Sequence, residues 1–236
     1  MEKSEQNVKS NKIRGRFKNF LYIFILIFSI VLLAVEGVVY YQKKVLTPFW
    51  VNGQSMYPTL NGYSTRKDGS SVGIDGGNAH IGDTVDYGVM NTNKSAIKKI
   101  KRFDVIVTQY SEDDTSNKIK RVVGMPGELV QFSTEASTNG DLYINGNYVA
   151  QPISTEIIRA ASYPSEGILL GSDEYYVLGD NRSHSSDSRD SSHGPIKKEW
   201  ITGKALYICG TAKVCQNSKG FLDIENVKYK WPKKIK

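Results

Sequence analysis

The sequence has few of the residues that build disulfide-rich or metal-bound proteins. Its 236 residues include 2 cysteines and 3 histidines. Two thiols are too few for a disulfide-stapled miniprotein or a four-thiolate zinc site, and no metal-ligand spacing appears. With 39% hydrophobic residues and 14 tyrosines, the composition also excludes a disordered chain. The length suits one medium domain with appendages.

The body of the chain also lacks a basic excess, although the net charge is +7. Residues 1–19 sum to +4 and residues 226–236 to +5, so residues 20–225 sum to −2. A nucleic-acid-binding protein needs its positive charge on the folded body. We therefore expect no nucleic-acid partner. The basic C-terminal tail, 226–236, which includes Trp231, is either a solvated tail or a segment that contacts lipid or wall polymer.

One long apolar run stands out near the N-terminus. Residues 20–35 contain Ser29 as their single polar member, and the apolar character continues to residue 41. About 20 apolar residues span a bilayer core. A cleaved secretory signal is the alternative, but this run is longer than such a core and no small-x-small pair follows it cleanly. The sequence predicts a single transmembrane anchor over residues 20–41.

The distribution of basic residues around this run predicts its orientation. Six basic residues lie in the 1–19 tail, whereas only Lys43 and Lys44 follow the run closely. The positive-inside rule then places the tail in the cytoplasm and the body, residues 42–225, outside the cell. We expect a single-pass protein of the cell membrane, in contact with the lipid bilayer.

The body shows the pattern of a mostly β domain. No sustained helical period and no internal repeat appear in it. Gly, Asp and Asn clusters separate the apolar runs, and Asn145–Gly146 is a strong hairpin signal. Residues 61–80, rich in Gly and Ser, are predicted to be a flexible insertion loop. The predicted strands are residues 84–90, 103–110, 118–123, 128–132, 142–149, 174–178 and 204–209.

Four short segments carry chemistry: GQSMYPTL at 53–60, RFDVIV at 102–107, IKRVVGMPGE at 119–128 and GDNRSHSSDSR at 179–189. Alone, each is ordinary: a turn, a buried strand, a strand with a solvent-facing lysine and a polar loop. In this order they resemble the conserved segments of the bacterial type I signal peptidases, and the single anchor resembles the Gram-positive branch. The resemblance implies a signal-peptidase-type, barrel-like β-sheet domain that removes signal peptides from exported preproteins.

The resemblance implies a serine/lysine dyad, with Ser55 as nucleophile and Lys120 as general base. A serine hydroxyl needs a base to attack a peptide bond. The three histidines leave a Ser–His–Asp triad to consider, but neither His184 nor His193 matches a catalytic position of the family. A lysine can act as base when burial lowers its pKa, and apolar residues surround Lys120. No metal or organic cofactor is implied.

Further roles follow from the same resemblance. Ser185 would orient the lysine, Asp187 and Arg189 would shape the site, and Asp180 would pair with Arg121. The oxyanion hole would use the Ser55 N–H and a donor at position 53, but Gly53 has no hydroxyl. The peptide would bind as an added strand beside Lys120, with small residues at −3 and −1. The pocket residues implied are Met56, Val51, Leu60, Ile119 and Val107.

Other readings of the sequence remain open. Self-cleaving SOS repressors share the dyad but carry a DNA-binding domain where this chain has an apolar span. A sortase would need a threonine-flanked cysteine, which Cys209 is not. A non-catalytic or narrow-client accessory protein for surface-structure assembly is the main alternative. Interaction with secretion machinery, a role of loop 61–80 in client choice and a Cys209–Cys215 disulfide are further hypotheses.

Overall fold

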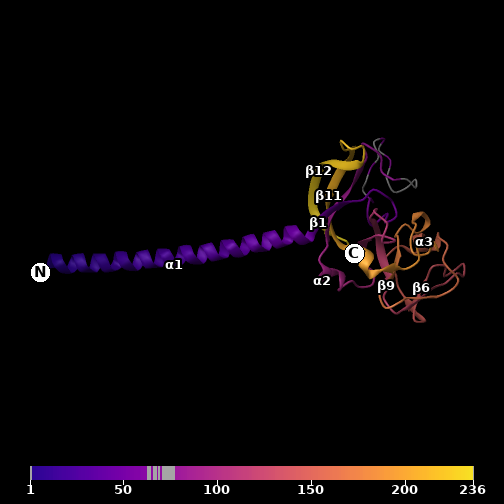
Figure 1. Ribbon diagram of the computed structural model, residues 1–236, viewed down its shortest axis with the longest axis horizontal. Helices are drawn as coiled ribbons and strands as arrows, with labels where there is room; N and C mark the ends of the chain where they lie inside the picture. The colour runs from indigo at the N-terminus through magenta and orange to yellow at the C-terminus, as the bar shows by residue number, and fades with distance from the viewer. Residues whose placement is uncertain (1, 63–64, 66–67, 69, 71–77, 236) are drawn as a thin grey trace. The chain divides into compact units, whose positions relative to one another are not determined.

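The apolar runs of the body form the strands of two antiparallel sheets (Figure 1). The computed structural model describes residues 2–62, 65, 68, 70 and 78–235. Most of the loop predicted at 61–80 lies outside the described residues. The chain divides into two compact units, residues 1–45 and 46–236.

The first unit is one helix, α1 (Glu2–Val45). Its stretch Lys18–Gln42 is long and apolar enough to cross a membrane, and none of it is buried against protein. The apolar span predicted at 20–41 lies inside this stretch. This stretch exposes apolar side chains on all sides of the helix, and a helix of this kind is stable in a lipid environment.

The larger sheet of the second unit has eight strands. Seven of them follow the order β1-β2-β11-β3-β4-β9-β10, and β12 pairs with β11. The long β11 pairs with β3 through its first residues and with β12 through its last, while β2 runs along its other edge. The strands are β1 (Leu46–Trp50), β2 (Thr84–Asn91), β3 (Val105–Thr108), β4 (Lys118–Gly124), β9 (Glu174–Leu178), β10 (Ile196–Lys197), β11 (Ile201–Gln216) and β12 (Leu222–Lys234).

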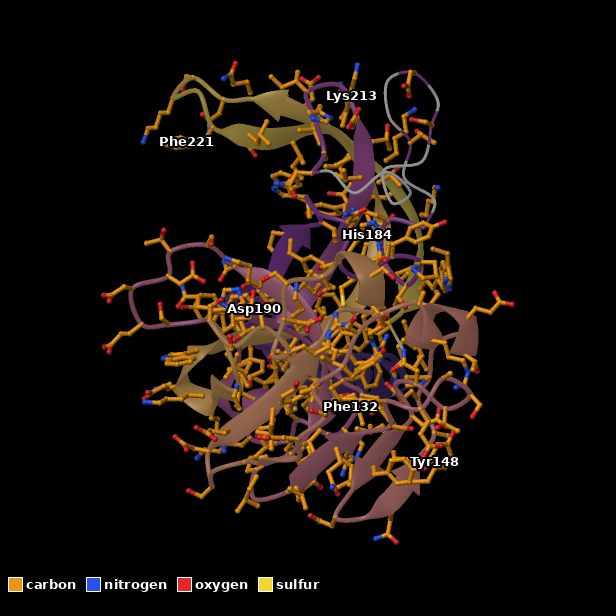
Figure 2. All side chains as sticks on the ribbon, turned by 90° about the vertical axis from the view of Figure 1, so that its right-hand side faces the viewer. Phe132, Tyr148, His184, Asp190, Lys213 and Phe221 are labelled. Atoms are coloured by element: carbon orange, nitrogen blue, oxygen red, sulfur yellow. The ribbon has the colours of Figure 1, made fainter. Side chains whose placement is uncertain are left out.

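The smaller sheet has four strands in the order β7-β6-β5-β8. These are β5 (Leu129–Phe132), β6 (Leu142–Ile144), β7 (Asn147–Val149) and β8 (Ile168–Leu169). Asn145 and Gly146 close the predicted hairpin with φ angles of 52° and 79°, as a two-residue turn requires. Within this unit, the smaller sheet and the β11–β12 hairpin lie at opposite ends in both views (Figures 1 and 2).

The described part of the second unit also contains four short helical turns, none longer than five residues. They are α2 (Lys94–Ile97), α3 (Thr155–Arg159) and the 3₁₀ turns Arg182–His184 and Lys198–Trp200. The prediction of a mostly β domain with one N-terminal apolar helix is confirmed. The sequence did not predict the short turns, because a helical period can be recognised only over more than one or two turns.

The structure differs from the sequence prediction at the C-terminus. A basic tail was expected over 226–236, but residues 226–234 belong to β12, which pairs with β11 from Leu222 to Lys234. Val227, Tyr229 and Trp231 favour a strand, and lysines and Pro232 are tolerated because β12 is an edge strand. Gly220, with φ of 82°, lies in the turn that joins the two strands.

Two smaller expectations also change. The strand predicted from residue 103 begins at Val105, because Phe103 adopts a left-handed φ of 70°. Cys209 and Cys215 are free. Both lie on β11, six residues apart, which is about 20 Å along a strand, and a disulfide needs α-carbons within about 7 Å. The two thiols therefore cannot pair within this strand.

Candidate active site

Ser55 lies in the loop after β1, and backbone hydrogen bonds hold this loop in a tight shape. Within it, Tyr57 N donates to Gln54 O (2.8 Å) and Leu60 N donates to Met56 O (2.9 Å). Across the site, Asn181 N donates to the Ser55 carbonyl (3.0 Å) and Asn181 Nδ2 donates to Gln54 O (3.3 Å). The first and fourth sequence segments are thereby joined at the serine itself.

Lys120 reaches the serine from β4. Its ammonium Nζ donates to Ser55 Oγ at 2.9 Å and to the Ile119 carbonyl at 3.2 Å. In the sheet, Lys120 lies opposite Ile106 of β3, and its exposed fraction is 4%. The lysine that the sequence places in a run of β-branched residues is therefore buried and does not face solvent.

Burial lowers the pKa of Lys120 to about 8 from its ordinary value of 10.5. The main cause is desolvation of the ammonium, which disfavours the charged form. Asp187 opposes this by raising the pKa, and Lys118 lowers it further. A lysine with this pKa has a substantial neutral fraction at mildly alkaline pH, as a general base requires.

The ion pair predicted between Arg121 and Asp180 is present and fully buried. Arg121 Nε and Nη2 donate to the two carboxylate oxygens at 2.7 and 2.6 Å, with exposed fractions of 1% and 0%. Thr59 Oγ1 donates to the same carboxylate (2.5 Å), and Arg121 Nη1 donates to the Phe103 carbonyl (2.7 Å). The left-handed backbone of Phe103 lies at this contact. The pair ties the nucleophile loop to β4, one residue beyond Lys120.

A second buried pair joins Asp187 to Arg189. Arg189 Nε and Nη2 donate to the carboxylate at 2.8 and 2.9 Å, and Gly179 N donates to Asp187 Oδ2 at 3.0 Å. Arg189 also donates to the Arg182 carbonyl (2.7 Å) and lies over the Tyr163 ring at 5.4 Å. The pair shapes the fourth segment, whose labelled member His184 lies between the two ends of the domain in Figure 2.

Ser185 does not contact the lysine as the resemblance implied. Its buried Oγ has no hydrogen-bond partner among the described residues. It lies instead against Gly179, where an added β-carbon would collide with both Ser185 Oγ and the Ser55 carbonyl. Gly179 is therefore required by close packing, because no side chain fits between the nucleophile loop and Ser185.

The five residues implied for the substrate pocket lie together or next to one another. Val51, Met56 and Leu60 form one buried cluster with Val105 and Ala205, against which Ile119 packs while partly exposed. Val107, also buried, faces Ile119 across the β3–β4 pair. The cluster itself is buried, and Ile119 is one of the partly exposed apolar residues that pack against it, with Phe49, Ile208 and Ile235.

The sequence did not predict the hydrogen-bonded pair of Asn61 and Asp86, which binds the backbone before Ser55. Asn61 Nδ2 donates to the carbonyls of Val51 (2.8 Å) and Gly53 (3.0 Å). Asn61 N donates to Asp86 Oδ2 (2.7 Å), and Asp86 N donates back to Asn61 Oδ1 (2.9 Å). Burial raises the pKa of the Asp86 carboxyl. The dipeptide Asn61–Gly62 signals a turn, but nothing in the sequence links it to Asp86.

Histidines play no part in this arrangement within the described residues. His193 Nε2 contacts Ser186 Oγ (2.7 Å) and its ring stacks on Tyr110 at 4.3 Å, while His80 faces Asp83 at 3.7 Å. Among the described residues, no hydrogen bond or ion pair joins His184 or His193 to Ser55 or Lys120. The same described residues contain no cluster of potential metal ligands.

Comparison with known proteins decides the family. The family model described as signal peptidase, peptidase S26, matches residues 20–209. The chain belongs to the S26 signal peptidase family. Signal peptidase I T of Bacillus subtilis is 31% identical over 170 residues, covering 68% of this chain and 72% of that protein. Signal peptidase IB of Staphylococcus aureus is 29% identical, covering 70% and 78%.

A solved structure gives a further match. The crystal structure of a signal peptidase I from Enterococcus faecalis is 28% identical and covers 45% of this chain, with a TM-score of 0.38. The relatives from Bacillus and Staphylococcus agree with the resemblance to the Gram-positive branch. This S26 chain is therefore a peptidase of the signal-peptidase class with one N-terminal helix suited to a membrane.

Proposed function

We propose that this S26 peptidase is a membrane-bound serine endopeptidase that removes signal peptides, with Ser55 as nucleophile and Lys120 as general base. The observation that carries the proposal is the 2.9 Å hydrogen bond between Lys120 Nζ and Ser55 Oγ in a water-poor environment. A nucleophile within hydrogen-bond reach of a base whose pKa is about 8 is the arrangement that acyl transfer requires.

The chemistry follows from this geometry. Neutral Lys120 accepts the Ser55 proton as Oγ attacks the scissile carbonyl carbon, and the C=O electron pair moves onto oxygen. When the tetrahedral intermediate collapses, the Lys120 ammonium returns the proton to the leaving amine. A water molecule then attacks the acyl carbon and gives a proton to neutral Lys120, and the ammonium returns this proton to Ser55 Oγ as the ester bond breaks and the acid product leaves. Every proton transfer uses the same nitrogen, so no second titrating group is needed.

The free edge of β4 supports binding of the signal peptide as an added strand. Residues 118–120 pair with β3 on one side, but β9 pairs with the other side only from Arg121 onward. Within the described residues, no strand covers this edge beside Lys120. An extended peptide would find unpaired backbone groups there, next to the partly exposed Ile119 and the apolar cluster on which Ile119 packs. A shallow apolar surface suits small residues at −3 and −1.

Cleavage of a labelled preprotein by the detergent-solubilised full chain tests the proposal. Wild type should cut after a small-x-small site, read from the N-terminus of the product, and Ser55→Ala and Lys120→Met should be inactive. Ser137→Ala and Lys101→Met, exposed in the described structure, serve as matched controls and should cut normally. Cleavage that survives Ser55→Ala would refute the dyad. An inert wild type beside an active relative would favour the accessory role.

The proposed orientation has the N-terminus in the cytoplasm and the second unit outside, as the basic residues before the span suggest. Trypsin added to intact spheroplasts should then digest the second unit from outside. Protection of that unit until the membrane is permeabilised would reverse the assignment.

A further inference from the structure

The backbone of residues 51–55, which leads to the nucleophile, is held at every carbonyl group. Tyr57 and Asn181 donate hydrogen bonds to the last two of these five carbonyls. Ala79 N donates to the Asn52 carbonyl at 2.8 Å. The remaining two carbonyls, at positions 51 and 53, lie directly before the serine. Because a catalytic group must be held within about 0.5 Å of its productive position, the donor to these two carbonyls bears on the reaction.

Asn61 binds both of these carbonyls with one side chain. Its Nδ2 donates to the Val51 carbonyl at 2.8 Å and to the Gly53 carbonyl at 3.0 Å. A carboxamide nitrogen carries two hydrogens, so both are used on the backbone that precedes Ser55. Asn61 is fully buried, and its φ of 61° is a left-handed conformation that asparagine adopts more readily than most residues.

Asp86 in turn holds Asn61. Asn61 N donates to Asp86 Oδ2 at 2.7 Å, and Asp86 N donates to Asn61 Oδ1 at 2.9 Å. The Asp86 carbonyl also accepts a hydrogen bond from Val51 N at 3.1 Å. Asp86 therefore binds both ends of the nucleophile loop, residues 51–61, from β2, which is paired on one side with β1 and on the other with β11. A site supported by a strand inside a sheet is held more precisely than one supported by a loop.

We propose that Asn61 positions Ser55 for attack, and that Asp86 sets the position of Asn61. The bond to the Gly53 carbonyl orients the planar peptide group between Gly53 and Gln54, and the next peptide group along the chain carries the Ser55 N–H. Asn61 transfers no proton and acts through the backbone, so it is a positioning residue. The inference rests on the proposed function and adds two positioning residues to it.

Steady-state cleavage of a signal-peptide substrate by the full chain in detergent, well below the Tm, tests this role. Asn61→Gly removes the carboxamide and keeps the left-handed backbone, because glycine adopts such a φ without strain. A misplacement of about 1 Å can cost about 100-fold in rate. Asn61→Gly should therefore lose about 100-fold in kcat with little change in KM. A wild-type kcat, or a loss confined to KM, would overturn the inference.

Asn139 offers a matched control for a general loss of stability. Its Nδ2 also donates to two backbone carbonyls, those of Arg159 at 3.1 Å and Ala161 at 2.8 Å. Asn139→Ala should lower the Tm, followed by tryptophan fluorescence, and leave kcat at the wild-type value. Equal losses of kcat in Asn139→Ala and Asn61→Gly would show that kcat follows stability, and the positioning role would fail.

Conservative variants separate hydrogen bonding from side-chain size. Asn61→Asp keeps the size and an oxygen for Asp86 N, but an ionised carboxylate has no hydrogen for the two carbonyls. It should lose at least as much kcat as Asn61→Gly. Asp86→Asn retains an oxygen that can accept from Asn61 N and should keep most of the kcat, whereas Asp86→Ala should lose much of it. A fully active Asn61→Asp, or an equal kcat in the two Asp86 variants, would contradict these assignments.

Ser55→Ala in the same assay separates the positioning role from the proposed function. An active wild type beside an inert Ser55→Ala supports the proposed function whatever Asn61 does. If Asn61→Gly then keeps the wild-type kcat, the positioning role alone fails. If the wild type is inert on a preprotein that a relative cleaves, the proposed function fails, and the positioning role fails with it.

Discussion

Replacing Lys120 by Met should stabilise the second unit while abolishing cleavage. The ammonium is buried next to apolar strand residues, and its pKa falls from 10.5 to about 8. Because a pKa difference of one corresponds to about 1.36 kcal/mol, holding this charge in the folded state costs about 3 kcal/mol at neutral pH. Methionine has a similar length and no charge, so it should remove this cost.

The same variant loses the hydrogen bond to Ser55 Oγ, and this loss offsets about 1 kcal/mol of the stability gained by removing the charge. The net gain is about 2 kcal/mol, or a rise in Tm of about 4–8 °C for a unit of this size. This gain in stability depends on pH. Between pH 8 and 10.5 the unfolded chain binds more protons at Lys120 than the folded chain does, so wild-type stability rises with pH there. The advantage of Lys120→Met should therefore be full below pH 8 and gone above about pH 10.5.

Tryptophan fluorescence of the detergent-solubilised chain, followed during thermal unfolding from pH 6 to 11, measures this difference. Other lysines and tyrosines titrate over the same range, so only the gap between the two proteins is informative. Lys101→Met, at an exposed position, should unfold with wild type at every pH. An equal Tm for Lys120→Met and wild type at pH 7, or a gap that persists unchanged at pH 11, would refute the assignment of a desolvated ammonium.

Three further predictions concern the site. The value of kcat/KM should rise with pH to half its plateau near pH 8, since neutral Lys120 is the base, whereas a midpoint near the histidine value of about 6.5 in a pH–rate profile would contradict it. Arg121→Leu should destabilise the second unit by about 3–5 kcal/mol in urea unfolding, because it leaves Asp180 buried without its cation; adding Asp180→Leu should restore most of the loss. Gly179→Ala should abolish cleavage and lower Tm, since its methyl group has no space beside the Ser55 carbonyl; a fully active variant would show that the loop yields.

Much of the fold was predictable where short-range pattern decides it. Alternation and turn residues located β2, β4, β5 and β9 to within about two residues, and Asn145–Gly146 placed one hairpin correctly. The β12 strand was missed because its lysines resemble a solvated segment. It forms a strand because β11 extends beyond β3 and offers it an edge, which is a long-range property of the sheet.

The same distinction holds for the site: residues that belong to a sequence motif were predictable, and residues whose role depends on long-range folding were not. Residues that carry a motif, such as Ser55, Lys120 and the Arg121–Asp180 pair, lie together as expected. Asn61 was not foreseen, because its part depends on which carbonyl groups lie beside it after folding. An asparagine before a glycine has the same sequence signature whether it only forms a turn or also binds the backbone of the nucleophile loop.

Arg189 explains how Lys120 can lose its proton although the Asp187 carboxylate raises its pKa. A free carboxylate near Lys120 would form an ion pair with the ammonium and keep it charged. Asp187 is instead bound at both oxygens by Arg189, and its Oδ2 also accepts a hydrogen bond from the Gly179 N–H. Asp187 still raises the pKa of Lys120, but less than burial lowers it. Because this carboxylate already has its own cation, desolvation decides the charge of Lys120, and the lysine can act as a base.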